Sequence, residues 1–236
     1  MKLSYNGTAY SGWQRQDNAV SVQQTIEKAL RLITGIDIEI VGCGRTDTGV
    51  HASFYVAHFD TEQPLDVELV YKLNSILPKD IAVHHCKETA DTFHARFSAI
   101  SREYCYFIHC RKDPFLNDRS WFVHQSLDID AMNRACTVLM DYDDFASFCK
   151  KGADNKTTIC KLTHAEWVKE DHRLIFTIRA DRFLRNMVRA IVGTMIDVGL
   201  GKTDMHNLRL IIEARDRGCS GASVPACGLY LTDVQY

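Results

Sequence analysis

The chain has 236 residues and a formal net charge of −2, with 46% hydrophobic and 25% charged residues. These values are typical of a globular protein that buries a core, and this length predicts one large domain or two small ones. No apolar run is long enough to span a bilayer. The near-neutral charge argues weakly against a nucleic-acid partner, although phosphate contact needs only a local positive face.

The nine cysteines are odd in number and scattered along the chain, as is typical of reduced thiols in a cytoplasm. The first residues enter strand-like sequence without a secretory apolar region, so we expect a cytoplasmic protein. Paired metal-ligand spacings such as Cys-x-x-Cys are absent from the sequence. The tightest cluster is residues 84–86, whose side chains alternate between the two faces of a strand, so we predict no metal site.

The first predicted element is a helix over residues 21–33. Ser21 and Gln24 fit a capping box at its start, and Gly35 stands where a helix commonly ends. Residues 36–41 alternate apolar and polar side chains and predict a half-buried strand. Residues 54–59 predict another strand by their β-branched and aromatic content.

Later elements alternate in type along the chain. The predicted segments are a helix at 67–77, a strand at 81–86, a long strand or hairpin arm at 94–109, a helix from Asp128 or Asp130 through residue 140, strands at 162–168 and 174–180, helices at 183–198 and 204–214, and a strand at 229–234.

The most informative stretch, residues 44–52, lies between two of these predicted strands. It places a single carboxylate, Asp47, in a glycine-bounded turn, with Arg45 two residues before it and His51 four residues after it. A strand, a charged turn and a second strand can present an acid at the edge of a cleft. The alternative is an Asx turn in which Asp47 accepts bonds from nearby backbone amides.

Two later patterns also have functional and structural interpretations. The cluster of Arg179, Arg182, Arg185 and Arg189 suits phosphate contact, but a solvated helix face explains it as well. Arg189 lies at the flank of the apolar arc of the predicted helix at 183–198, where it can reach a carboxylate or extend to solvent. Tyr106 lies on a predicted strand, where it can stack on a nucleobase or fill the core.

Several ordered blocks resemble one family. Residues 44–52 resemble the signature of the TruA family of tRNA pseudouridine synthases. Further blocks match in the family's order at residues 5–8, 12–14, 21–27, 102–106, 144–148, 186–189 and 228–231. The resemblance therefore covers nearly the whole chain, which is far more specific than one short motif.

The resemblance implies an α+β protein with the pseudouridine synthase fold. Two related halves, residues 1–97 and 98–236, would each have a mainly antiparallel sheet with helices on the outside, and the active-site cleft would lie between them. The family also implies a homodimer that binds tRNA and acts on uridines at positions 38, 39 and 40 of the anticodon stem-loop.

The same resemblance assigns roles to individual residues. Asp47 would be the catalytic carboxylate, and Arg189 would pair with it. Tyr106 would lie against the target uracil, and Leu229 would pack near the base. Arg45 would grip a phosphate or fill the space that the flipped base leaves, while its alternative role is to stabilise the turn.

The implied reaction breaks the N1–C1′ bond of uridine and rejoins the uracil through C5. Nothing is oxidised or added, so no cofactor is required. Asp47 would act as a nucleophile or as a base, and the sequence leaves both open. Two alternatives differ in kind. One is a non-catalytic RNA-binding module on the same fold, and the other is a carboxylate-dependent hydrolase, which usually needs a second acid.

Overall fold

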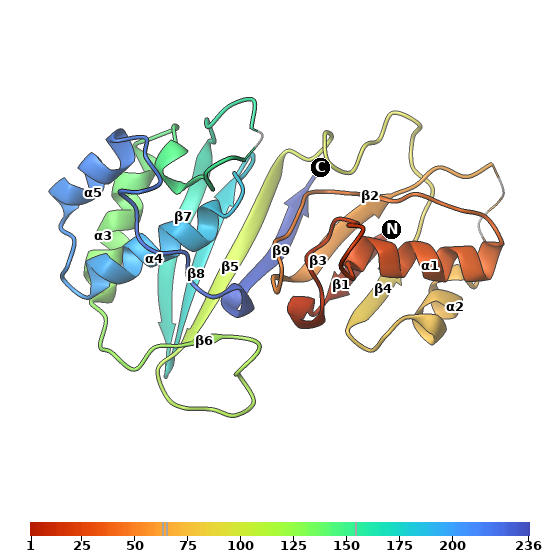
Figure 1. Cartoon of the computed structure of the whole chain (residues 1–236), viewed down its shortest axis with the longest axis horizontal. Helices are drawn as coiled ribbons and strands as arrows, with labels where there is room; N and C mark the ends of the chain where they lie inside the picture. Colours follow the sequence, from red (N-terminus) through yellow and green to blue (C-terminus); the bar gives the residue numbers. More distant parts are fainter. Residues whose placement is uncertain (63, 65, 154) are drawn as a thin grey trace. The chain divides into compact units, whose positions relative to one another are not determined.

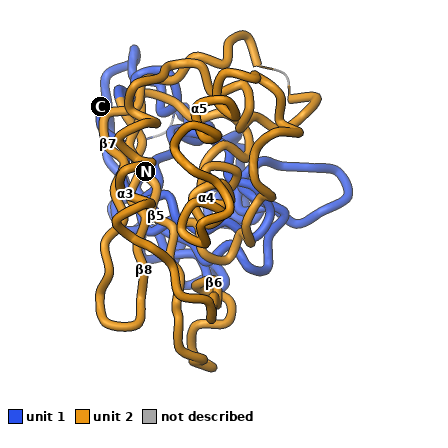
Figure 2. Tube along the Cα trace, turned by 90° about the vertical axis from the view of Figure 1, so that its left-hand side faces the viewer, with its two compact units in different colours: residues 1–100, 230–236 blue, residues 101–229 orange. Residues whose placement is uncertain are grey.

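The computed structural model describes residues 1–62, 64, 66–153 and 155–236. The chain forms two compact units, coloured separately in Figure 2. Unit 1 comprises Met1–Ile100 together with Tyr230–Tyr236, and unit 2 comprises Ser101–Leu229. The C-terminal segment therefore belongs with the N-terminal part of the chain.

The described residues of unit 1 form a sheet together with the α-helices α1 and α2 (Figure 1). Its described strands run in the order β4-β1-β3-β9, with β2 paired to β3. β3 and β9 are parallel, and His51 is in register with Tyr230, while the other pairs are antiparallel. The elements are β1 (Lys2–Tyr5), η1 (Gly7–Ala9), α1 (Val22–Thr34), β2 (Val41–Gly42), β3 (His51–His58), α2 (Leu69–Ile76), β4 (Ile81–His85) and β9 (Leu229–Gln235).

The first helix of unit 1 forms as the sequence predicts. Ser21 is its N-cap and accepts a hydrogen bond from the amide of Gln24 at 3.2 Å. Gly35 ends the helix with a left-handed φ of 74°, a conformation that costs glycine little. Val22 and Ile26 are buried on the inner face, so apolar burial and both caps favour the same boundaries.

The strand predicted over residues 36–41 is wrong for most of its length, because only Val41–Gly42 pairs as β2. The amide of Ile40 donates to Glu27 Oε1 at 3.1 Å, and its carbonyl accepts from Gln23 Nε2 at 3.0 Å. Side chains of α1 thus take the backbone groups that a neighbouring strand would have paired.

Unit 2 contains three antiparallel strands in the order β5-β8-β7, with β6 parallel to β5. α3 packs on β7, and α4 and α5 pack against α3 (Figure 1). The elements are β5 (Ser101–His109), β6 (Trp121–Phe122), α3 (Ile129–Met140), η2 (Ala146–Phe148), β7 (Leu162–Glu170), β8 (Arg173–Ala180), α4 (Met187–Gly199), α5 (Met205–Glu213) and η3 (Ala226–Gly228).

Two predicted elements are shorter than expected. Residues 94–100 precede β5, and residues 95–98 turn because His94 Nδ1 accepts hydrogen bonds from the amides of Arg96 and Phe97. The helix predicted from residue 183 begins at Met187, because Asn186 adopts a left-handed φ of 67°. A non-glycine residue in that conformation interrupts a right-handed helix.

Helices and mainly antiparallel strands in each unit confirm the α+β class. The helices of the described residues are all too short or too polar to cross a membrane.

Candidate functional site

The turn that carries Asp47 lies in unit 1, between β2 and β3. Main-chain hydrogen bonds hold it at three points. The amide of Trp13 donates to Thr46 O at 3.2 Å, the amide of Gly49 to Tyr10 O at 3.2 Å, and the amide of Val50 to Asp47 O at 3.1 Å. These three bonds use only backbone atoms, so they define the path of the turn without using the Asp47 carboxylate.

Two glycines allow the segment after β1 to approach this turn closely. A Cβ on Gly12 would lie 2.3 Å from Thr46 O, and Gly12 also has a φ of 89°. A Cβ on Gly7 would lie 2.0 Å from Val50 O. Any other residue at these positions would push the turn away. The sequence analysis did not predict this role. The signal that could have indicated it is the glycine in each of the blocks 5–8 and 12–14.

A buried aromatic cluster contacts the turn and supports it. Tyr5 Oη and Thr46 Oγ1 share a 2.9 Å hydrogen bond, and Thr46 is only 8% exposed. Trp13 stacks on Tyr55 with ring centroids 4.1 Å apart, and Tyr55 Oη donates to the carbonyl of Gly44. Because these side chains are packed and bonded, the turn has a rigid base.

Tyr5→Phe should lower the free energy of unfolding by about 1–2 kcal/mol, because it removes a hydrogen bond and leaves the buried Thr46 hydroxyl with one partner fewer. Denaturant unfolding of the purified protein measures this change. Tyr71→Phe is the matched control, because Tyr71 is 73% exposed, and its effect should stay below about 0.5 kcal/mol. Equal stability of the two variants would contradict this account of the turn.

The two charged residues of the turn are less buried than Thr46 between them. Thr46 is buried, whereas Arg45 is exposed and Asp47 is partly exposed. The turn therefore buries the Thr46 hydroxyl and leaves the Arg45 guanidinium and the Asp47 carboxylate accessible to solvent, the latter in part. A partly exposed carboxylate on a rigid turn can reach a substrate without a change of backbone conformation.

His51 has a structural place in this region. Its ring is 1% exposed, its Nδ1 accepts from the amide of Gly7 at 3.0 Å, and it stacks on Tyr230 with centroids 4.4 Å apart. The acceptor role requires an unprotonated Nδ1. His51 thus joins η1, β3 and β9 within unit 1.

Tyr106 lies on β5 in unit 2 and is fully buried. Its Oη donates to the carbonyl of Pro225 at 2.7 Å, and a Cβ on Gly228 would lie 2.7 Å from its ring. Burial raises the pKa of the Tyr106 phenol far above its usual value, with a smaller contribution from Cys227. The hydroxyl is therefore a neutral donor at all physiological pH values.

Arg189 lies on α4 and is half-buried. Its Nε donates to the carbonyl of Val224 at 2.7 Å, and the amide of Val224 donates back to the carbonyl of Arg189 at 3.3 Å. Because a guanidinium is planar, the bond at Nε constrains the direction of its two Nη groups.

The predicted site residues therefore fall into two groups. Arg45 and Asp47 share one turn of unit 1, whereas Tyr106 and Arg189 bond to the adjacent carbonyls of Val224 and Pro225 in unit 2. Leu229 is 6% exposed at the start of β9 and is also assigned to unit 2. The sequence did not indicate that Tyr106 and Arg189 share one supporting segment.

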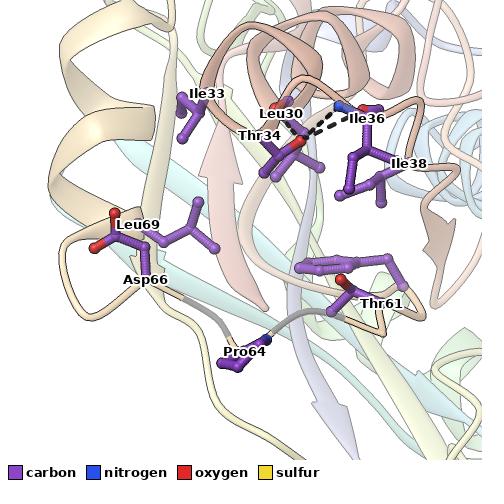
Figure 3. Close-up of a pocket in the computed structure, with 10 residues that line it drawn as sticks. Leu30, Ile33, Thr34, Ile36, Ile38, Thr61, Pro64, Asp66 and Leu69 are labelled. Atoms are coloured by element: carbon purple, nitrogen blue, oxygen red, sulfur yellow. Dashed lines mark hydrogen bonds between the residues drawn. The ribbon is translucent and has the colours of Figure 1, made fainter.

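Unit 1 also contains a separate pocket, with a volume of about 210 Å³ (Figure 3). Apolar side chains from the end of α1 and from α2 point toward one another there, and the lining acid Asp66 pairs with Lys72. The lining residues are Leu30, Ile33, Thr34, Ile36, Ile38, Phe59, Thr61, Pro64, Asp66 and Leu69. None of them belongs to the turn that carries Asp47.

A sequence profile described as tRNA pseudouridine synthase matches residues 2–98 and 139–236. The chain belongs to this family. The resemblance seen in the sequence is thereby confirmed, and with it the class of enzyme, an isomerase that converts uridine to pseudouridine.

Relatives of the family from several bacteria are similar over nearly their full length. A tRNA pseudouridine synthase A of Parabacteroides distasonis is 50% identical, over 99% of this chain and 94% of its own. One from Bacteroides thetaiotaomicron is 49% identical, over 99% and 88%. One from Caldicellulosiruptor bescii is 40% identical, over 100% and 98%.

Proposed function

We propose that this enzyme converts uridine to pseudouridine in the anticodon stem-loop of tRNA, at positions 38, 39 and 40, with Asp47 as the catalytic carboxylate. One observation carries the proposal. Asp47 is a partly exposed acid on a turn fixed by backbone bonds, by Gly7 and Gly12, and by a buried aromatic cluster. A catalytic group needs this kind of fixed support on rigid elements.

The reaction keeps every heavy atom of the uridine and leaves its composition unchanged. The N1–C1′ bond breaks, a C5–C1′ bond forms, the C5 hydrogen leaves as a proton, and N1 gains a proton. An ionised Asp47 starts the sequence as a nucleophile on the sugar or the ring, or as a base that removes a ribose proton. The target base must first leave its stack, which costs a few kcal/mol.

The remaining roles divide between the two units. Arg189 pairs with Asp47 and orients it, as a guanidinium does in a bidentate pair. Because Tyr106 is fully buried, its ring can lie against the target uracil only after the residues that cover it move. Leu229 makes an apolar contact near the base. Arg45 contacts a phosphate or fills the vacated stack, and its exposure on the turn supports such a contact.

We also propose that the enzyme works in the cytoplasm as a homodimer and that one tRNA contacts both subunits. A dimer would help explain how a chain of formal charge −2 binds a polyanion, because two modest basic faces can form one groove. The mass in solution tests it. A dimer mass at working concentration is expected, and a monomer mass would contradict it.

Transcripts with single uridine-to-cytidine changes at positions 38, 39 and 40 test the substrate assignment. Each change should remove pseudouridine at that position only. Pseudouridine outside the anticodon stem-loop would contradict the assignment. Tight tRNA binding without conversion would instead support the RNA-binding module, and release of free uracil would support the hydrolase.

A further inference from the structure

Residues 220–225 of unit 2 form a segment that packs directly against α4. The amide of Gly221 donates to Thr194 Oγ1 at 2.9 Å. A Cβ on Gly193 would lie 1.9 Å from the carbonyl of Ala222, so the helix and the segment touch through their backbones. Glycine at position 193 permits this approach. The 220–225 segment is thus held against α4 by backbone contact.

The end of this segment supports two of the site residues of unit 2, Arg189 and Tyr106. The carbonyl of Val224 accepts from Arg189 Nε, and the carbonyl of Pro225 accepts from Tyr106 Oη, each at 2.7 Å. A displacement of Val224 and Pro225 would therefore move a guanidinium and a phenol together. Whatever holds these two residues also determines where Arg189 and Tyr106 point.

Ser223 precedes these carbonyls and is fixed from two sides. Its Oγ accepts from Asn186 Nδ2 at 2.5 Å and from Arg217 Nη2 at 2.8 Å. Arg217 also donates through Nη1 to Ser220 Oγ at 2.9 Å. Ser223 Oγ is therefore a shared acceptor that ties the segment to the start of α4.

Asn186 adopts an unusual backbone conformation to make its bond. Its φ and ψ are 67° and 4°, and its side chain makes no cap hydrogen bond to α4. Asparagine commonly caps a helix from extended backbone, so this residue gives up a favourable role. Asparagine also tolerates the left-handed region better than most residues with a side chain. Its amide is used on Ser223 instead.

We propose that Ser223, held by Asn186 and Arg217, is a positioning residue for uridine isomerisation. It places the carbonyl of Val224 and, through it, the Arg189 guanidinium, while the neighbouring carbonyl of Pro225 anchors the segment to the buried Tyr106 hydroxyl. The proposal rests on the proposed function, because it takes Arg189 to contact the substrate or the catalytic carboxylate.

Ser223→Ala and Asn186→Gly test the proposal in single-turnover and steady-state assays on tRNA. Each should lower kcat about tenfold, because small displacements of oriented groups are costly, while KM for tRNA stays within about twofold. Asn186→Gly keeps the left-handed backbone and removes only the amide. Ser223→Thr keeps the acceptor and should restore most of the rate.

Asp171→Gly is the matched control for the backbone change. Asp171 has a φ of 53° in the turn between β7 and β8, and its variant should keep wild-type kcat. The double variant Asn186→Gly/Ser223→Ala should be no slower than the slower single variant, since both changes remove the same bond.

Three results would overturn the positioning role: wild-type kcat in both single variants, losses that multiply in the double variant, or losses that merely follow a lower Tm. Arg189→Met, measured in parallel, separates this proposal from the one on which it rests. If Arg189→Met is inactive while Ser223→Ala and Asn186→Gly are fully active, the positioning role of Ser223 is rejected and the proposed role of Arg189 stands. A fully active Arg189→Met would reject the proposed role of Arg189 and the positioning proposal with it.

Discussion

Asp47→Asn should lower the rate of pseudouridine formation by about 10³-fold or more and leave tRNA affinity within about threefold. Asparagine has nearly the shape of aspartate, but it is neither a nucleophile nor a base. The backbone bonds from Trp13 and Val50, together with the Tyr5–Thr46 bond, stay in place, so the turn should keep its path.

Single-turnover conversion, followed by chromatography of the digested nucleosides, measures this effect. Asp37→Asn is the matched control on the same unit. Asp37 is 78% exposed and pairs with Arg31 at 3.0 Å on the surface, so its loss should leave the rate unchanged. An Asp47→Asn enzyme that keeps more than about a tenth of the wild-type rate would exclude both of the roles proposed for the carboxylate.

Gly12→Ala should have the second largest effect, because it changes the support of the turn. Its new Cβ would lie 2.3 Å from Thr46 O and 3.1 Å from the carbonyl carbon of Asp47, at a φ of 89°. Strain and overpacking together should cost roughly 2–4 kcal/mol of stability. The displaced turn should also lower the rate of the folded enzyme about 10²-fold.

Gly35→Ala separates strain from displacement. Gly35 has a similar φ of 74°, but a Cβ there would meet nothing within 4 Å. This variant should lose about 1 kcal/mol of stability and none of its rate. Thermal unfolding and single-turnover rates, each on folded protein, measure the two effects. Equal rate losses in both variants would show that the contact between Gly12 and the turn has no catalytic importance.

Local signals explain why much of the fold follows from the sequence. Ser21 and Gly35 mark the ends of α1 because capping and left-handed backbone depend on a few adjacent residues. The strand predicted over residues 36–41 failed for a different reason. An alternating pattern reports which side chains are buried, but here Ile40 bonds to side chains of α1 rather than to another strand.

The site shows the same division between local and long-range information. A single run of residues identifies Asp47 and its turn, whereas the contact of Gly12 with Thr46 joins distant segments. The start of α4 was misplaced because apolar periodicity continues backward through Leu184. In the structure the helix begins only after Asn186, whose backbone is left-handed and whose side chain bonds to Ser223, far along the chain.

The most direct test of the account is tritium release from tRNA labelled at C5 of uridine, measured for the wild type and for Asp47→Asn at equal tRNA occupancy. Rejoining the ring through C5 forces that hydrogen into water. The wild type should release one tritium for each pseudouridine formed, without free uracil, and Asp47→Asn should release none. Tight tRNA binding by the wild type without release, or equal release by both proteins, would contradict the central role given to Asp47.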